Sequence, residues 1–343
     1  MIYADFESLL EENTTGKTIE IKHLHKACSY MFNVVSDFYE YKFEPKIFRG
    51  ENAIQNFLDE ILKTKDEIMK IIHGYKPMII SKSEQKEYEK SNICHICEKQ
   101  INTTLNDVKS DPDYRRATSV CGNTKFSVEQ VYKKYNIKVR DHCHITGKYI
   151  GPAHYDCNLN RNYNKFKIPV FFHNGKGYDA HFIIQEVSKI DAIEQNDIIP
   201  KNEEKYITYG FNNLKFVDSI SFMNPDDSLD KLVNSLRNGD AYNTRKFKQS
   251  KKYFLKQYPF MKDEDFKLII TKGIYPYEYT NDFDKFNETK LPDIKCFYSS
   301  LNDETITEEQ YKHAQKIWET FKIKNMGEYH DFYLKTDVLL QRP

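Results

Sequence analysis

The segment IYADFE, residues 2–7, alternates apolar and acidic side chains, which is the pattern of a half-buried β-strand. Asp5 and Glu7 stand two residues apart in it, so their carboxylates leave the same face of the strand. Both have neighbours expected in the protein interior, and a pair of divalent cations would neutralise them there. Taken alone, however, the pair fits a solvated edge strand better. The assignment therefore depends on residues elsewhere in the chain.

The rest of the sequence alternates between strand-like and helical patterns. Strand-like apolar runs occur at residues 28–35, 168–172 and 214–217. Residues 52–73 carry one apolar stripe at helical spacing, which predicts a helix packed on a sheet. Further helices are predicted at residues 228–236, after a capping box at 307–310, and at about 327–340. These patterns predict an α/β fold with a central sheet and flanking helices.

The chain has 343 residues, more than one compact core usually holds, which favours two domains or one domain with an insertion. Residues 82–136 are polar, with few aliphatic side chains, and they interrupt the sheet pattern. We therefore predict a first domain part at residues 1–75, an inserted module at 76–167 and a second domain part at 168–343.

Composition limits the cellular context and the partners. The sequence contains no run of apolar residues long enough to span a membrane and no basic-then-apolar signal, which predicts a soluble, intracellular protein that does not use a membrane as partner and leaves nucleus or cytoplasm open. Basic and acidic residues are equal in number, 51 each, so contacts to phosphate would have to be local. A basic stripe with interleaved aromatic residues at 245–256 is one candidate, and a solvated charged face is the alternative.

Polar residues also gather near two later elements. After the strand at 168–172, a glycine-containing turn presents Asn174 and Asp179 at the carboxyl end of the sheet, where open α/β sheets bind ligands. In the last helix, Tyr333 and Asp337 are four residues apart and so share one face. Together with the acidic strand, these residues form a far more specific set than any one of them.

In these segments the sequence resembles the 3′–5′ exonuclease domain of protein-primed B-family DNA polymerases, including those of self-synthesising transposons and linear plasmids. The resemblance covers residues 1 to about 75 and 169–340. It implies an RNase H-like exonuclease fold, a mixed central sheet with flanking helices, and DNA with a single-stranded 3′ end as substrate. It also implies that Tyr333 orients the attacking water, that Asn174 contacts the strand, and that two magnesium or manganese ions are held by Asp5, Glu7, Asp179 and Asp337.

Two further segments resemble motifs of that family. Residues 217–220 resemble its single-strand-binding segment, which implies a DNA contact by Ser219, although Ser228 in a rival match at residues 228–232 would serve equally. Residues 272–275 resemble its lysine motif, which implies that Lys272 neutralises the phosphate being cleaved. A plain surface turn is the alternative for Lys272.

A cluster of cysteine and histidine residues lies within the predicted insertion. Two pairs with the same short spacing, about sixty residues apart, are typical of a tetrahedral zinc site. The four predicted zinc ligands are Cys94, Cys97, His154 and Cys157. Cys121 or Cys143 could replace one of them. Because the seven cysteines are an odd number, a disulfide framework is disfavoured.

Between these pairs the pattern reads strand, turn, strand and helix, and it resembles the ββα module of the HNH and phage recombination endonuclease VII families. The resemblance implies that Asp141 and Asn158 bind a magnesium ion and that His142 is the general base. His154 stands where a cysteine is more usual, and Ile150 stands where relatives often carry an arginine. A zinc module that only binds DNA or maintains structure is therefore the alternative.

The metal-binding aspartate motifs of a polymerase palm are not found, so the polymerase domain is expected to be absent, and the chain to be either a fragment or a shortened gene product. The sequence predicts a metal-dependent, proofreading-type 3′–5′ DNA exonuclease. HNH endonuclease activity of the insert would add duplex or branched DNA as substrate. The alternative is a catalytically silent fragment that binds DNA, a terminal protein or a separate polymerase part.

Overall fold

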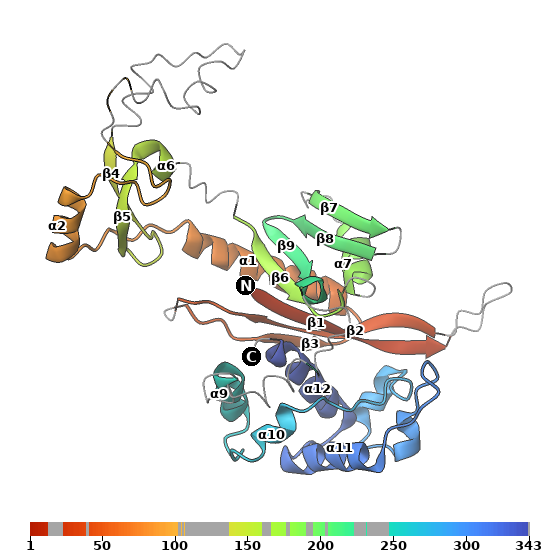
Figure 1. Ribbon diagram of the computed structural model, residues 1–343. Coiled ribbons are helices and arrows are strands. Elements are labelled where there is room, and N and C mark those ends of the chain that lie inside the picture. The colour runs from red at the N-terminus through yellow and green to blue at the C-terminus, as the bar shows by residue number, and fades with distance from the viewer. Residues whose placement is uncertain are drawn as a thin grey trace. The chain divides into compact units, whose positions relative to one another are not determined.

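The computed structural model describes residues 1–12, 23–38, 41–101, 104, 106, 137–159, 166–175, 179–189, 195–202, 205–222, 231 and 247–341. The chain divides into two compact units. The sheet unit comprises Met1–Lys63 and Lys167–Pro343, and the hairpin unit comprises Thr64–Phe166. The sheet unit is a mixed α/β structure with helices flanking a central sheet (Figure 1).

The central sheet has seven strands in the described part of the chain, in the order β3-β2-β1-β6-β9-β8-β7. The strands are β1 (Ile2–Glu12), β2 (His23–Val34), β3 (Lys46–Arg49), β6 (Ile168–Phe172), β7 (Gln195–Asn202), β8 (Lys205–Phe211) and β9 (Leu214–Asp218). β6 runs parallel to β1 and to β9, and the other neighbours are antiparallel. The carboxyl ends of β6 and β9 therefore lie at the same edge of the sheet.

Alternation along β1 directs its side chains to two different helical layers. Phe6 points to the layer formed by α1 (Ala53–Ile72) and α7 (Asp179–Val187), where its ring contacts Phe57 and Phe182. Asp5 and Glu7 point to the opposite face, because successive side chains alternate across a strand. The predicted helix at 52–73 agrees with α1, whose apolar stripe is buried on the sheet.

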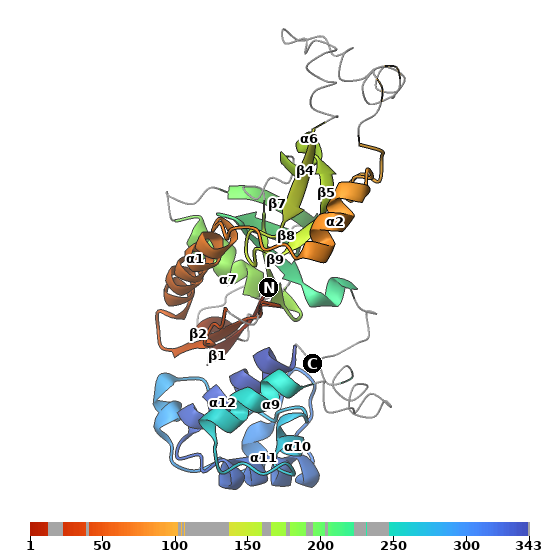
Figure 2. The same ribbon diagram turned by 90° about the vertical axis from the view of Figure 1, so that its left-hand side faces the viewer.

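The second layer is helical and ends in α12. It contains α9 (Lys248–Gln257), α10 (Phe266–Ile269), α11 (Glu308–Thr320) and α12 (Met326–Leu340), together with the short helices η4 (Phe283–Asn287) and η5 (Ile294–Phe297). Figure 2 shows α9–α12 gathered on one side of β1 and β2. α11 starts at the predicted capping box, in which Thr307 and Gln310 exchange hydrogen bonds. α12 is buried almost throughout because it packs on both the sheet and α11.

The lysine-rich helix α9 belongs to this core. Phe247 and Phe254 in the predicted basic stripe are buried, and Lys251 and Lys256 form ion pairs with Asp263 and Glu44. Arg245 and Lys246 lie outside the described residues, as does nearly all of the predicted helix at 228–236. On α9 itself, the stripe is therefore the solvated face of a core helix.

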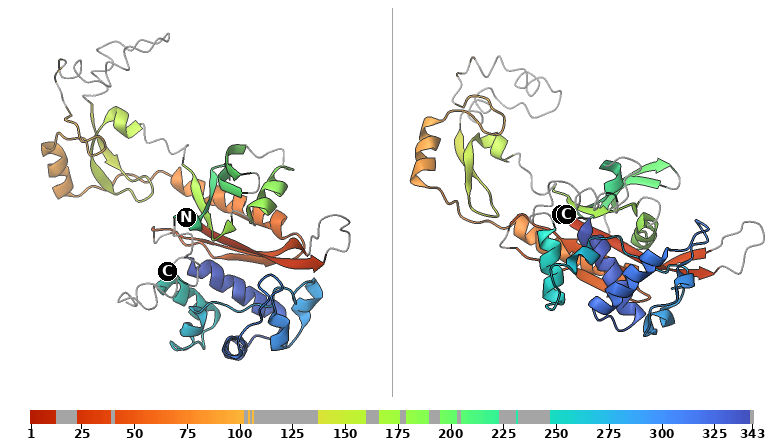
Figure 3. Two further views of the ribbon diagram at one scale, coloured as in Figure 1. Left: turned by 45° about the vertical axis from the view of Figure 1, so that its right-hand side comes forward. Right: turned by 60° about the horizontal axis from the view of Figure 1, so that its bottom comes forward.

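The hairpin unit is small and poor in apolar core. It contains α2 (Lys82–Lys90), the antiparallel pair β4 (Lys138–His142) and β5 (Tyr149–His154), and α6 (Tyr155–Leu159), which can be followed in Figure 3. Its main apolar cluster has three fully buried members, Cys94, Ile101 and Ala153. The strand, turn, strand, helix order agrees with the order expected from the sequence.

Across the described residues, no helix combines the length and the apolar character needed to cross a membrane.

Candidate active site and metal centre

Three carboxylates from distant parts of the sequence meet in the sheet unit. Asp5 and Glu7 come from β1, and Asp337 comes from α12, which packs on that strand. One carboxylate oxygen from each residue lies within 4.8 Å of the others. Glu7 is buried, and the other two are half-buried. This is a group of acidic oxygens that could hold a divalent cation.

Electrostatics makes this cluster unfavourable as a set of free carboxylates. Burial raises the pKa of Asp5 and of Glu7 well above the ordinary values, and the neighbouring carboxylates raise both further. Burial also raises the pKa of Asp337 to about 7, although a hydrogen bond from Tyr333 and the charge of Lys272 act in the opposite direction. Bound cations would offset the repulsion between the carboxylates, which contributes to the raised pKa values of Asp5 and Glu7.

Asp179 adds a fourth carboxylate near the cluster. It is the first residue of α7 and is 3% exposed, and its Oδ1 has no hydrogen-bond partner among the described residues. Burial raises its pKa to about 8, and its charge contributes to the raised pKa values of Asp5 and Glu7. It does not belong to the group of three within 4.8 Å. This unpartnered buried carboxylate oxygen is available as a metal ligand.

A tyrosine pair adjoins the carboxylates. Tyr333 lies one helical turn before Asp337 on α12, is 7% exposed, and has its hydroxyl 2.7 Å from that of Tyr277. Burial raises the pKa of Tyr333 well above its ordinary value, so its hydroxyl stays protonated. Tyr277 could not be predicted from the sequence, because nothing in its local pattern distinguishes it from the other tyrosines of the chain.

The Lys272 loop approaches the same pair at close range. A Cβ atom at Gly273 would lie 2.5 Å from Cδ2 and 2.6 Å from Cε2 of the Tyr333 ring, so only glycine allows this approach. Lys272 is exposed and near enough to lower the pKa of Asp337 by its charge. The structure thus brings Lys272 toward the carboxylates.

Two turns at the sheet edge are tied together. Asp218, the last residue of β9, is 5% exposed, and its Oδ1 accepts the backbone N–H groups of Asn174 at 3.1 Å and Ile220 at 3.0 Å. Asn174 has a left-handed backbone with φ 64°. His173 Nδ1 lies 2.9 Å from Ser219 Oγ and adds a second link. Asn174 and Ser219 therefore belong to one hydrogen-bonded arrangement, whereas Ser228 lies outside the described residues.

The predicted zinc ligands gather in the hairpin unit. Ligand atoms of Cys94, Cys97, His154 and Cys157 lie within 4.8 Å of one another. His154 Nδ1 is 3.4 Å from Cys97 Sγ and 3.8 Å from Cys157 Sγ, while its Nε2 is 3.2 Å from the carbonyl of Gln100. That contact fixes the ring with Nδ1 toward the sulfur atoms. This cluster can bind a metal ion such as zinc.

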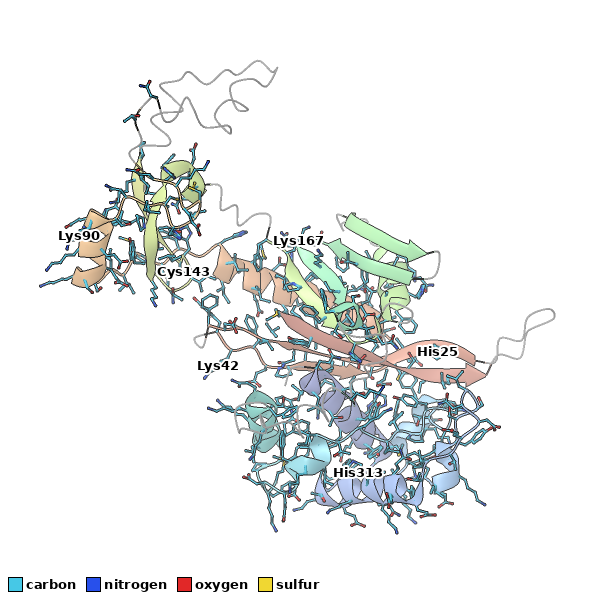
Figure 4. All side chains as sticks on the ribbon, viewed as in Figure 1. His25, Lys42, Lys90, Cys143, Lys167 and His313 are labelled. Carbon is cyan, nitrogen blue, oxygen red and sulfur yellow. The ribbon has the colours of Figure 1, made fainter. Side chains whose placement is uncertain are left out.

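The two alternative cysteines are not part of that cluster. Cys143, labelled in Figure 4, lies in the turn after β4 and is not one of the four grouped residues. Cys121 lies outside the described residues.

The hairpin also carries the residues predicted for a second metal site. Asp141 is 3% exposed, and its Oδ2 lies 2.7 Å from Nε2 of His95, the residue after Cys94. His142 has a buried Nε2 with no hydrogen-bond partner in the described part of the chain, and its ring lies beside the rings of Tyr75 and His144. Asn158, in α6, is half-buried. The contact of Asp141 with His95 had no signal in the sequence.

No protein-family model matches the chain, and it matches no curated protein and no solved structure.

Proposed function

We propose that this chain is a metal-dependent 3′–5′ DNA exonuclease of the proofreading type, with the RNase H-like fold of the exonuclease domain of protein-primed B-family DNA polymerases. One observation carries the proposal. Carboxylates from β1 and α12 converge within 4.8 Å beside a buried tyrosine hydroxyl. Buried carboxylates this close together destabilise a plain core, and they suit a metal site that hydrolyses a phosphodiester.

The proposed roles follow from the chemistry of each side chain. Magnesium or manganese ions held by Asp5, Glu7, Asp337 and Asp179 would activate a water molecule and stabilise the oxygens of the cleaved phosphate. Tyr333, fixed by Tyr277, would orient that water through its hydroxyl. Lys272 would neutralise charge on the phosphate. Asn174 and Ser219 would hold the strand through the linked turns.

A 5′-labelled single strand tests this proposal. In magnesium or manganese the wild-type chain is expected to shorten the strand stepwise from its 3′ end, and the Asp5→Ala, Glu7→Ala double variant is expected to lose this activity. Binding of the same strand in calcium should persist in the variant if it remains folded. Equal survival of the strand with both proteins would contradict the exonuclease proposal and favour the silent binding fragment.

The hairpin unit supports a second candidate activity. Asp141 and His142 lie on a hairpin next to the proposed zinc site, as in the ββα module of HNH endonucleases. We propose a structural zinc ion at Cys94, Cys97, His154 and Cys157, and weak endonuclease activity that uses Asp141, Asn158 and His142. Ile150 is exposed and carries no charge for a phosphate contact, which favours weak or branch-selective cutting.

A closed circular duplex distinguishes the two activities, since it offers no 3′ end. Nicking of the circle, or cutting of a four-way junction, is expected to survive Asp5→Ala and to disappear with His142→Ala. If an active exonuclease preparation leaves both substrates uncut, the hairpin unit binds DNA or maintains structure only.

A further inference from the structure

An exposed phenylalanine ends the short helix η3 (Ser219–Phe222), directly after the Ser219 turn. Phe222 is 73% exposed, more than any other aromatic side chain in the described residues. A single exposed apolar side chain is common on protein surfaces and by itself indicates nothing. Its neighbours make this one informative.

Phe222 is the outer member of three successive rings. Its ring centroid lies 6.5 Å from that of Phe171 on β6, and Phe171 stacks on Tyr3 of β1 at 5.6 Å with an interplanar angle of 25°. Tyr3 and Phe171 are register partners on parallel strands. We call these three rings the aromatic row.

The aromatic row shares a strand face with the carboxylate cluster. Tyr3, Asp5 and Glu7 are spaced two residues apart on β1, so all three side chains leave the same face. Tyr3 and Phe171 are partly exposed rather than sealed in the core. The row therefore leads from beside the candidate metal ligands to the surface of the sheet unit.

The short helix that carries the outer ring is also linked by hydrogen bonds to the neighbouring turn. Asp218 accepts the N–H of Ile220 at the start of η3 and the N–H of Asn174 in the neighbouring turn. Asp218 thus links η3, which ends at Phe222, to the turn that carries Asn174. The Asn174 amide and the Ser219 hydroxyl are both able to hydrogen-bond a nucleic-acid strand.

We infer that the aromatic row is a base-stacking site for the unpaired 3′ end of a DNA strand, with Phe222 receiving the base farthest from the carboxylates. The inference rests on the proposed nuclease function and specifies which side chains hold the bases of its substrate. Aromatic rings stack on any base, so the site is indifferent to sequence. In a duplex the base faces are already occupied by stacking, so the row selects unpaired ends.

Binding without cleavage tests this inference. Fluorescence anisotropy with a labelled single-stranded oligonucleotide in EDTA, and again in calcium, gives Kd values for the wild type and for Phe222→Ala, Phe222→Leu and Phe222→Trp. Phe222→Ala is expected to weaken binding about tenfold. Phe222→Trp is expected to bind the oligonucleotide with an affinity close to that of the wild type. Phe222→Leu is expected to bind as weakly as Phe222→Ala, since leucine keeps apolar area but has no ring. Phe260→Ala is the matched control, because Phe260 is an exposed phenylalanine of the same unit outside the row.

Two further measurements distinguish base stacking by Phe222 from an electrostatic contribution to binding and from a role in the cleavage step. The ratio of Kd values between Phe222→Ala and wild type should stay constant as salt rises, because stacking releases no counterions. With magnesium, KM for a single strand should rise by about the factor seen in Kd, and kcat should fall much less.

Three results would overturn the inference: no measurable binding by the wild type, unchanged affinity in Phe222→Ala, or restoration by leucine equal to that by tryptophan. Failure of the nuclease proposal looks different. If binding depends on the Phe222 ring but no cleavage occurs, the stacking site stands and the nuclease proposal fails. If cleavage occurs but binding does not depend on the ring, the nuclease proposal stands and the stacking site fails.

Discussion

Gly273 shows how a residue without a side chain can determine a candidate active site. Any Cβ atom there would meet the Tyr333 ring at 2.5 Å, so the loop that carries Lys272 approaches Tyr333 only because position 273 is glycine. Tyr333 in turn hydrogen-bonds Tyr277 and Asp337. A small displacement here would move the hydroxyl that is proposed to orient water.

Gly273→Ala is expected to lower kcat of single-strand digestion about tenfold or more, because misplacement of positioning groups by a fraction of an ångström to an ångström has effects of that size. Single-turnover digestion in excess enzyme measures it. Lys272→Ala provides the comparison, since it removes the charge and leaves the ring in place. A Gly273→Ala variant with wild-type kcat would show that this loop can shift without affecting catalysis.

At this scale the sequence predicted residues better than it predicted their partners. Asp5, Glu7 and Asp337 were selected from their spacing and from a family resemblance, and the structure brings them together. Asp218 and His173 were not selected, because their roles depend on contacts between β6 and β9, which are far apart in sequence. Local patterns carry no information on such contacts.

Among the elements, α12 carries a second buried polar group besides the catalytic candidates. His330 is 1% exposed, with Nε2 2.6 Å from Ser29 Oγ on β2 and Nδ1 2.7 Å from the hydroxyl of Tyr275. Burial lowers its pKa from 6.5 to about 3, and the charge of Arg49 lowers it further. The imidazole therefore joins α12 to the sheet in its neutral form.

This arrangement predicts a loss of stability in acid. Between pH 6.5 and 3 the unfolded chain binds a proton at His330 and the folded chain does not, so stability falls as the pH decreases below about 6.5. From pH 7 to pH 5 the wild type should lose about 2 kcal/mol relative to His330→Gln, which has no titrating group there. Urea unfolding at both pH values measures the difference. A difference between the two proteins that is independent of pH would contradict the prediction.

The elements of the hairpin unit depend on the metal cluster more than on packing. Its apolar core is too small to stabilise β4, β5 and α6, so zinc would supply most of the folding free energy. We expect about one zinc per chain. Cys157→Ser should release the zinc and make residues 64–166 protease-sensitive, with single-strand digestion by the sheet unit retained.

Cys143→Ser is the matched control, because Cys143 lies outside the four-residue cluster, and it should keep the zinc. Metal analysis of chelator-free wild type measures the content. Wild-type protein that contains no zinc would contradict the proposed zinc site.

Elements with a strong local pattern were predicted, and elements defined by long-range pairing were missed. The expected helix at 52–73 and the helix after the capping box agree with α1 and α11, because an apolar stripe and a cap are local features. The edge strand β3 and the β7–β8 pair were not predicted. Their residues lack clear alternation, and hydrogen bonds to neighbouring strands define them.

The molecule as a whole combines two opposite responses to pH. His330 destabilises the fold below about pH 6.5. The carboxylate cluster acts in the other direction, because raised pKa values mean that the folded chain holds protons that the unfolded chain has released. That contribution is lost as the pH rises through about 7 for Asp337 and about 8 for Asp179. Because several raised carboxylates oppose one histidine, the metal-free sheet unit should be more stable at about pH 5 than at about pH 8.

Divalent cations should change this profile. Magnesium or manganese competes with protons for the carboxylates, so the rise in Tm on adding the cation should be larger at pH 8.5 than at pH 6. Differential scanning calorimetry with and without cation measures it. Asp5→Asn combined with Asp337→Asn should abolish the rise, whereas an equal rise at both pH values would argue against cation binding at this cluster.

The separation of β1 and α12 along the chain also has a consequence during synthesis on the ribosome. Asp5 and Glu7 are synthesised first, and Asp337 follows only after the hairpin unit, β6, β9 and the helices α9–α11 have been made. The carboxylate cluster requires one of the longest-range contacts in the described fold, and such contacts form late because loop closure is entropically costly. A nascent chain that stalls anywhere before α12 would thus be unable to assemble the cluster.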